Sequence, residues 1–171
     1  SCHLLLSYTL LEARSSPTHI GTLGGHVHAI RAYVVVPVYN RIRITASWLE
    51  QIASQDYHEL FVVLVDDNSS DGTRAMAKRY IGECVNGVIL NSGGNSWWGG
   101  SVQVGLDFVF RHSRDEGDVV IFMNDDTLFS ESIISSLVST HKDHSDSVIA
   151  AVNVVNGAVI SAGQIMKSWF F

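Results

Sequence analysis

The sequence is poor in charged residues. Lys, Arg, Asp and Glu make up 16% of its 171 residues, whereas about 25% is usual for a soluble domain. We therefore expect part of the surface to be covered by a partner, a membrane face or a further segment of chain. The net charge is −6, and no cluster of Lys and Arg offers the phosphate contacts that nucleic-acid binding requires. This excludes nucleic acid as the main ligand.

Cysteines and long apolar runs are also scarce. Cys2 and Cys84 lie far apart and at no metal-ligand spacing, which favours unpaired thiols in a reducing compartment. No apolar run approaches the roughly 20 residues that span a bilayer, and no basic segment precedes the N-terminal leucines as a signal peptide would require. We expect a cytoplasmic protein, with a peripheral position at the cytoplasmic face of a membrane as the alternative.

Several catalytic motifs are missing. The sequence has no Gly-x-Ser-x-Gly elbow, no cysteine-centred nucleophile motif, no P-loop and no dinucleotide fingerprint. The histidine pairs His26/His28 and His141/His144 have no carboxylate or cysteine at ligand spacing. We interpret both pairs as ordinary polar surface.

From Arg31 onward, apolar runs alternate with helical patterns. The predicted strands are 32–36, 60–65, 85–90, 119–123 and 148–152, and a hairpin arm is predicted over 159–166. The predicted helices are 44–52, 74–80, 101–110 and 130–140, the last with Ser130 as N-cap. This alternation predicts an α/β fold with a mostly parallel sheet flanked by helices.

Residues 1–30 have no sustained periodicity beyond a short helix predicted over 4–13. We expect an N-terminal arm or linker over residues 1–30 and one domain over residues 31–171, a length that one hydrophobic core can serve.

A polar cluster follows each of the first four predicted strands. These clusters are Tyr39-Asn40, Asp66-Asp67-Asn68, Asn91 to Asn95, and Asn124-Asp125-Asp126. Open α/β sheets bind their ligands at the carboxyl edge of the strands. The clusters are therefore predicted to share one crevice.

Two of these clusters are acidic, and in one crevice they would bring four carboxylates together. Such an arrangement is electrostatically strained without a cation, and it suits Mg²⁺ or Mn²⁺, which bind through one or two carboxylates plus substrate phosphates. The alternative is turn chemistry, because Asp and Asn are common in loops after strands. Because two Asp-Asp pairs occur at equivalent strand ends, we favour a metal site over turn chemistry.

The segment 91–100 is glycine-rich and leads into a helix. Its backbone amides are expected to approach a phosphate or sugar, aided by the helix N-terminus. Of Trp97 and Trp98, we expect at least one to pack in the core and the other to face a sugar or base ring.

The motifs Val34-Val-Val-Pro-Val-Tyr-Asn40, Val65-Asp-Asp-Asn-Ser-Ser-Asp-Gly-Thr73 and Phe122-Met-Asn-Asp-Asp-Thr127, in this order, resemble those of the family 2 inverting glycosyltransferases with the GT-A fold. The loop Gly94-Asn-Ser-Trp-Trp-Gly-Gly-Ser-Val-Gln-Val-Gly-Leu106 is similar to a Gly-Asn-x-x-Trp-x-Gly segment of bacterial rhamnosyl- and galactofuranosyl-transferase-like members. The resemblance covers about residues 31–165.

The resemblance implies a role for individual residues. Pro37 and Tyr39 would border the nucleobase, Asp67 would accept a hydrogen bond from it, and Asp125 would lie near the ribose. Asp126 would ligate the Mg²⁺ or Mn²⁺ that bridges the diphosphate, although the motif reads Asn124-Asp125-Asp126 instead of Asp-x-Asp. The remaining predicted substrate-binding residues are Asn40, Asn95 and Trp98.

The resemblance also implies a function. A metal-dependent enzyme would transfer a sugar from a nucleotide-diphosphate donor to a saccharide or lipid-linked acceptor, in cell-surface polysaccharide or glycolipid synthesis. In the family the catalytic base lies well downstream, so we expect the base to be absent from this chain, which would bind donor but transfer sugar poorly. Its apolar end, Trp169 to Phe171, predicts self-association into a homo-oligomer.

Two other functions stay open. A non-catalytic nucleotide-sugar-binding module would explain a missing base. A sugar nucleotidyltransferase would need a basic glycine-rich loop near the first strand, and residues 36–40 contain none.

Overall fold

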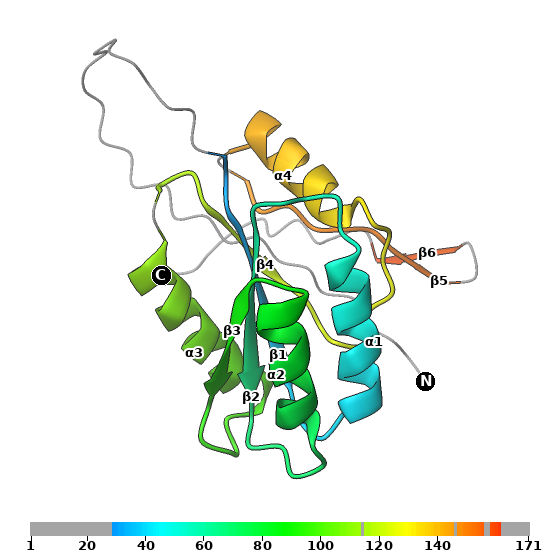
Figure 1. Ribbon diagram of the computed structural model, residues 1–171. Coiled ribbons are helices and arrows are strands. Elements are labelled where there is room, and N and C mark those ends of the chain that lie inside the picture. The colour runs from blue at the N-terminus through cyan, green and yellow to red at the C-terminus, as the bar shows by residue number, and fades with distance from the viewer. Residues whose placement is uncertain (1–28, 114, 146, 156–157, 162–171) are drawn as a thin grey trace, which may run out of the picture.

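The computed structural model describes residues 29–113, 115–145, 147–155 and 158–161. Within these residues, ten elements follow one another (Figure 1). They are β1 (Ala32–Val38), α1 (Ile42–Ala53), β2 (Leu60–Asp66), α2 (Thr73–Glu83), β3 (Gly87–Asn91), α3 (Trp97–His112), β4 (Val119–Phe122), α4 (Ile133–Asp143), β5 (Asn153–Val155) and β6 (Ala158–Ser161).

The main sheet has four parallel strands in the order β3-β2-β1-β4. The central strands β1 and β2 are almost continuous apolar runs because both of their faces are covered. Val34 and Val36 face one apolar layer and Tyr33 and Val35 face the other, as the two-residue repeat of a strand requires. This confirms the predicted α/β fold with a mostly parallel sheet.

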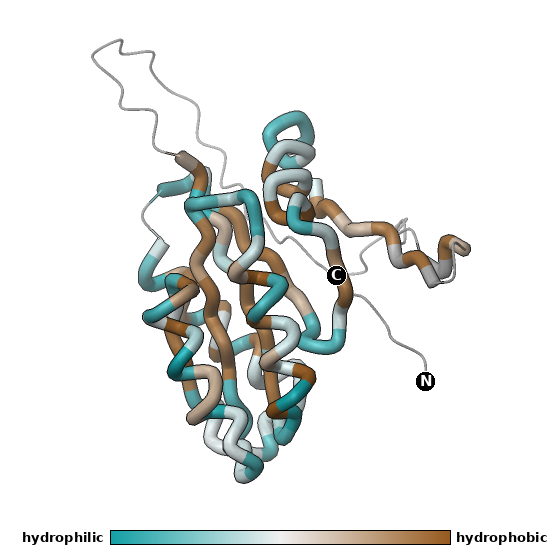
Figure 2. Tube along the Cα trace, turned by 45° about the vertical axis from the view of Figure 1, so that its right-hand side comes forward, coloured by the Kyte–Doolittle hydropathy of each residue, from teal (hydrophilic) through white to brown (hydrophobic). Residues whose placement is uncertain are grey.

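The two faces of the sheet are covered unequally. Helices α1, α2 and α4 pack on one face, where Trp48 and Leu49 of α1 and Ile134 of α4 are fully buried. Helix α3 covers the other face, on the opposite side of the sheet in Figure 1. Figure 2 shows the apolar strands at the centre and polar positions along the outer sides of the helices.

Helix α3 lies very close to the sheet at Gly105. A Cβ atom at this position would lie 2.5 Å from Val35 Cγ1 and 3.3 Å from Val65 Cγ2. Only a residue without a side chain fits here, so Gly105 sets the distance between α3 and the two central strands.

The chain after β4 differs from the prediction. Residues 148–152 do not form a strand; instead β5 and β6 pair as an antiparallel hairpin that projects away from the main sheet (Figure 1). The hairpin arm predicted over 159–166 is thereby confirmed for the part up to residue 161, and the rest lies outside the described residues. Helix α4 begins at Ile133 with Ser132 at the N-cap position, so Ser130 was the wrong choice.

Other predictions hold to within a few residues. Helix α2 has non-helical backbone angles at Ile81 and Gly82, so its regular part ends at Tyr80, as predicted. Helix α3 begins at Trp97, four residues earlier than expected. The predicted helix over 4–13 lies outside the described residues, as does most of the proposed arm over 1–30.

His141 overturns one surface prediction. Its side chain, on α4, is buried, and its Nδ1 atom has no hydrogen-bond partner. Burial lowers the pKa of the His141 imidazole, because the charged form loses its hydration.

Among the described residues, no helix has both the length and the apolar character needed to cross a bilayer.

Candidate functional site

A cleft of about 690 Å³ opens at the carboxyl edge of the main sheet, the lower edge in Figure 1. The loops after β1, β2, β3 and β4 all contribute to it, as the order of polar clusters predicts. The predicted site residues that line it are Pro37, Tyr39, Asp67, Asn95, Trp98, Asp125 and Asp126.

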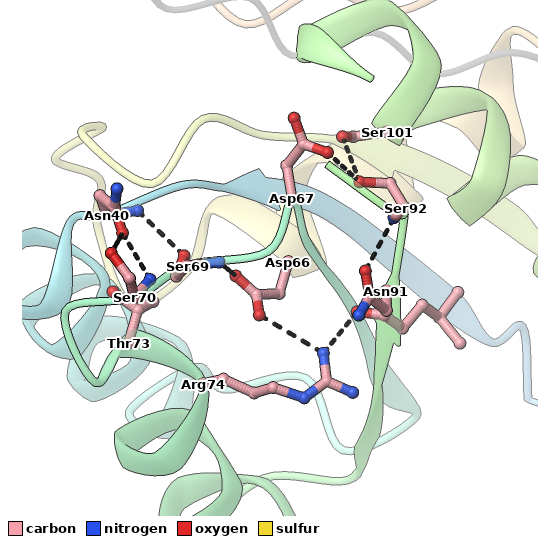
Figure 3. Close-up of polar contacts among 12 residues, drawn as sticks. Asn40, Asp66, Asp67, Ser69, Ser70, Thr73, Arg74, Asn91, Ser92 and Ser101 are labelled. Carbon is pink, nitrogen blue, oxygen red and sulfur yellow. Dashed lines mark hydrogen bonds and ion pairs between the residues drawn. The ribbon is translucent and has the colours of Figure 1, made fainter. Parts of the chain in front are cut away.

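Asn40 is the predicted site residue that the structure does not place in the cleft lining. Its backbone N–H donates to Ser69 Oγ at 2.9 Å, and its Oδ1 atom accepts from the Ser70 N–H at 2.8 Å (Figure 3). Asn40 adopts a left-handed backbone, with φ 48°, which Asn tolerates better than most residues. It therefore ties the loop after β1 to the loop after β2.

Asp66 and Asp67 are adjacent in sequence but point in opposite directions (Figure 3). The buried Asp66 carboxylate accepts from the Ser69 N–H at 3.0 Å and from Arg74 Nη1 at 3.4 Å. Arg74 also donates to the Leu90 carbonyl at 3.2 Å. Through Arg74, Asp66 is thus joined to α2 and β3.

Asp67 holds the start of α3. Its carboxylate accepts from Ser92 Oγ at 2.6 Å, from the Ser96 N–H at 3.1 Å and from the Trp97 N–H at 3.2 Å. The Ser92 hydroxyl bond is the largest cause of the lowered pKa of Asp67, and the two backbone amides add to it. We expected the helix N-terminus to offer its amides to a ligand; these two amides already bind Asp67.

Trp97 and Trp98 both lie on the surface, which corrects the expectation that one packs in the core. Trp97 is 81% exposed and has φ 54°, a left-handed conformation that is strained for a bulky residue. Trp98 is half-exposed, and its Nε1–H donates to Asn124 Oδ1 at 2.9 Å. This bond joins the first turn of α3 to the loop after β4.

Asp125 and Asp126 share one basic partner. Arg41 Nη1 lies 3.1 Å from Asp125 Oδ1 and 3.1 Å from Asp126 Oδ2. Thr45 Oγ1 donates to the other Asp125 oxygen at 2.8 Å. Burial raises the pKa of the Asp125 carboxyl, and the bond from Thr45 and the charge of Arg41 oppose that rise.

The four carboxylates do not converge on one point, which corrects the sequence-based picture of a shared cation. Asp66 pairs with Arg74, Asp67 accepts hydrogen bonds from Ser92 and from two backbone amides, and Asp125 and Asp126 share Arg41. Within the part of the chain that the structure describes, no three His, Cys, Asp or Glu side chains are grouped to hold a metal ion.

The pair Asp125-Asp126 still fits a hard divalent cation. It offers carboxylate oxygens, and the Asp126 side chain is 25% exposed in the cleft wall. Mg²⁺ and Mn²⁺ usually take one or two protein carboxylates and complete their coordination with phosphate oxygens and water. A third protein ligand is not required.

Arg41 is a charged residue of the site that the sequence did not lead us to predict. It directly follows Tyr39-Asn40 at the carboxyl edge of the first strand, so its position in the polar cluster was a usable signal. Within the described residues, it is the only basic side chain in the cleft wall, beside Asp67, Asp125 and Asp126. One positive and three negative groups leave the cleft with a net charge of −2.

Asp71 lies outside the cleft and supports two helix starts. Its carboxylate accepts from the Thr73 N–H at 2.9 Å and from the Ile42 N–H at 3.0 Å, the first residues of α2 and α1. The Thr73 hydroxyl bond is the main cause of the lowered pKa of Asp71. Asp71 therefore supports the starts of both α1 and α2.

Comparison with known proteins gives a consistent picture. Residues 33–168 match the sequence profile of a family described as glycosyl transferase family 2. The chain is 31% identical over 130 residues to the poly(ribitol-phosphate) beta-N-acetylglucosaminyltransferase TarS of Staphylococcus aureus, covering 72% of this chain and 21% of TarS. It is 27% identical over 106 residues to the GalNAc(5)-diNAcBac-PP-undecaprenol beta-1,3-glucosyltransferase of Campylobacter jejuni, covering 61% of this chain and 32% of that protein. The chain therefore spans about a fifth to a third of the length of these relatives.

Solved structures agree on the fold. A crystal structure of an S. aureus TarS fragment in complex with UDP-GlcNAc has a TM-score of 0.59 at 25% identity, over 68% of this chain and 32% of that chain. The mannosyltransferase PcManGT of Pyrobaculum calidifontis, in complex with GDP-Man and Mn²⁺, has a TM-score of 0.56 at 24% identity, over 67% of this chain and 33% of that chain. The second likeness concerns the fold alone.

Proposed function

Because the chain belongs to glycosyl transferase family 2, we propose that it forms the donor-binding part of an enzyme that transfers a sugar from a nucleotide diphosphate to an acceptor hydroxyl. The donor lies in the cleft at the carboxyl edge of the main sheet. The TarS structure with UDP-GlcNAc has the same fold, which supports a nucleotide sugar as the ligand class.

The charge of the cleft carries the proposal of a divalent cation. Three carboxylates and one guanidinium line the cleft, so a doubly charged diphosphate would meet a wall that is already negative. A cation held by Asp125 and Asp126 removes this repulsion. When bound, such a cation also acts as a Lewis acid that stabilises the charge on the leaving nucleoside diphosphate.

The chain's own residues position the donor. Pro37 and Tyr39 border the nucleobase, and Asp125 lies near the ribose. Asp67 has a double role in this proposal: its carboxylate holds the start of α3 through Ser92, Ser96 and Trp97, and it lines the cleft, where it accepts a hydrogen bond from the base. Asn95 and Trp98 face the rest of the donor. None of these residues is assigned as the catalytic base.

The relatives suggest the acceptor class. One is named for poly(ribitol-phosphate) and the other for a saccharide on PP-undecaprenol. We therefore propose a saccharide or lipid-linked acceptor, in cell-surface polysaccharide or glycolipid synthesis. The free, exposed thiol of Cys84 fits a reducing, cytoplasmic location, either in solution or at the inner face of a membrane.

A thermal-shift screen of nucleotide-diphosphate sugars, with and without Mn²⁺, tests the proposal. We expect one donor class to raise the melting temperature in the presence of Mn²⁺ and to do so much less in its absence. No shift with any nucleotide sugar would contradict the proposal. For a donor that binds, incubation sorts the alternatives: transfer or hydrolysis indicates a glycosyltransferase, pyrophosphorolysis a nucleotidyltransferase, and binding alone a non-catalytic module.

A further inference from the structure

Arg41 holds the position between the two carboxylates that a cation would need. A single nitrogen, Nη1, contacts both Asp125 Oδ1 and Asp126 Oδ2 at 3.1 Å. We propose that Arg41 is an exchangeable counter-cation, which offsets one of the two negative charges of Asp125 and Asp126 before ligands bind and moves to the donor's diphosphate when the divalent cation binds. This inference rests on the proposed function.

The contact of Arg41 with Asp125 and Asp126 has a geometry that is easily broken. Both carboxylates are bound through one nitrogen, whereas a guanidinium that grips a carboxylate firmly uses two parallel N–H bonds. The Arg41 side chain is 46% exposed, so it can move without uncovering core atoms. Release therefore requires little rearrangement.

The rest of the site stays in place when Arg41 moves. Asp125 is 3% exposed and keeps the bond from Thr45 Oγ1 at 2.8 Å. The Arg41 backbone N–H donates to Thr73 Oγ1 at 3.2 Å, which anchors the start of α1. Only the long side chain is free to change partner, and it stays within the same cleft wall.

Charge explains the direction of the exchange. With Arg41 in place, the carboxylate pair has a net charge of −1, from two negative charges and one positive. A divalent cation neutralises the pair completely and frees the guanidinium, whose planar donors match a phosphate group. A nucleotide therefore attracts Arg41 away from the carboxylates, and each ligand strengthens the binding of the other.

The test compares Arg41→Gln with Arg43→Gln. Arg43 lies two residues further along the chain, is exposed, and has no ion pair among the described residues. Both variants remove one positive charge near the cleft, so the difference between them isolates the contact with the carboxylates. The dissociation constant of Mn²⁺ is measured without nucleotide and with saturating UDP, with a correction for Mn²⁺ bound to free UDP.

In the wild type, we expect UDP to strengthen Mn²⁺ binding by about tenfold or more, within the usual range of coupling between sites. In Arg41→Gln, Mn²⁺ alone is expected to bind about three- to tenfold more tightly than in the wild type, and the effect of UDP is expected to shrink. Arg43→Gln is expected to match the wild type in both. Unchanged or weaker Mn²⁺ binding by Arg41→Gln without nucleotide would overturn the inference.

The wild-type protein gives a second readout in case Arg41→Gln does not fold. Titration with diamagnetic Mg²⁺ is expected to shift the guanidinium NMR signal of Arg41 and to leave that of Arg43 unchanged. A constant Arg41 signal at saturating Mg²⁺ and UDP overturns the exchange without any variant.

The two hypotheses fail in different ways. If no nucleotide binds but Arg41→Gln strengthens Mn²⁺ binding, the competition between Arg41 and the cation holds and the proposed function is wrong. If the wild type binds UDP with Mn²⁺ but Arg41→Gln behaves as Arg43→Gln, the proposed function holds and the counter-cation is wrong.

Discussion

The two Asp-Asp pairs lie at the carboxyl ends of β2 and β4, the strands on either side of β1, and they have different partners. Asp67 accepts hydrogen bonds from backbone amides and a short side chain, and Asp66 accepts from the Ser69 N–H and from Arg74, which the Leu90 carbonyl also holds. Asp125 and Asp126 share a long, half-exposed arginine side chain.

The difference lies in what would have to move to free a carboxylate. Releasing Asp67 would require the start of α3 to unfold, because the Ser96 and Trp97 amides belong to that turn. Releasing Asp126 requires a change in the side-chain angles of Arg41. The first pair therefore shapes the cleft, and the second pair offers it an exchangeable charge.

The largest effect is expected from Asp67→Ala. It removes a carboxylate that accepts from three groups, so we expect a loss of about 3 kcal/mol in the free energy of unfolding. We also expect nucleotide binding to weaken by at least about tenfold, because the glycine-rich wall of the cleft loses its anchor. Chemical denaturation and calorimetry measure the two effects.

Asp71→Ala serves as the control for this variant. It removes a carboxylate that supports two helix starts away from the cleft, so the melting temperature is expected to fall while nucleotide affinity stays near the wild-type value. If Asp71→Ala weakens nucleotide binding and Asp67→Ala leaves it unchanged, the roles of these two residues are exchanged.

Asp126→Asn tests the second pair. The side chain is partly exposed and contributes little to packing, so we expect the fold to remain intact. Nucleotide binding, however, is expected to lose its dependence on Mg²⁺ or Mn²⁺, as calorimetry with and without metal can measure. Binding that is independent of metal in both the wild type and Asp126→Asn would remove the case for a cation at this pair.

The pH dependence of stability gives a finer comparison. The pKa of Asp67 is lowered in the folded protein, so its contribution is complete above the unfolded pKa of about 3.9 and is lost as the pH falls through the folded pKa. The pKa of Asp125 is raised, so its protonation favours the folded state, and that contribution is lost as the pH rises from about 4 through the folded pKa.

Two asparagine variants separate these contributions. In Asp67→Asn, the free energy of unfolding is expected to fall less steeply on acidification than in the wild type. In Asp125→Asn, it is expected to fall more steeply, because the protonation that offsets the loss is gone. Urea denaturation at several pH values below about 6 measures both slopes, and slopes that change in the same direction would contradict the assignment.

The smallest effect is expected from Trp98→Phe. The change removes the hydrogen bond from Nε1–H to Asn124 at a half-exposed position, which is expected to cost no more than about 1 kcal/mol of stability. Because that bond joins the wall shaped by Asp67 to the loop of the second pair, we expect a modest loss of nucleotide affinity. A loss as large as that of Asp67→Ala would mean that Trp98 itself contacts the ligand strongly.

The fold was predictable where one short pattern decides the structure. The apolar runs of β1 and β2 specify buried parallel strands because no partly exposed strand would carry so few polar residues. Residues 148–152 have a similar composition but do not enter the sheet. Whether such a segment forms a strand depends on whether an edge of the main sheet is free to pair with it. That depends on the fold of the whole chain and cannot be read from the segment.

The site was predictable in position but only partly in detail. Strand ends meet at one edge, so the cleft and most of its residues followed from their order along the chain. The direction of each side chain did not: Asp66 and Asn40 are bound by groups from other loops, and such pairings leave no local signal. The shared bond of Arg41 to two carboxylates about 85 positions away was likewise hidden.

A substitution at Gly105 is expected to affect the cleft, although this residue does not line it. Helix α3 leaves no room for a side chain between itself and β1 and β2 at this residue, about 12 Å along the helix from Trp97 at a rise of about 1.5 Å per residue. A methyl group at position 105, near the middle of α3, would push the helix away from the sheet and tilt it. The tilt would displace the N-terminal end of α3, which lines the cleft. Selection for ligand binding can therefore act on a buried position that no ligand reaches.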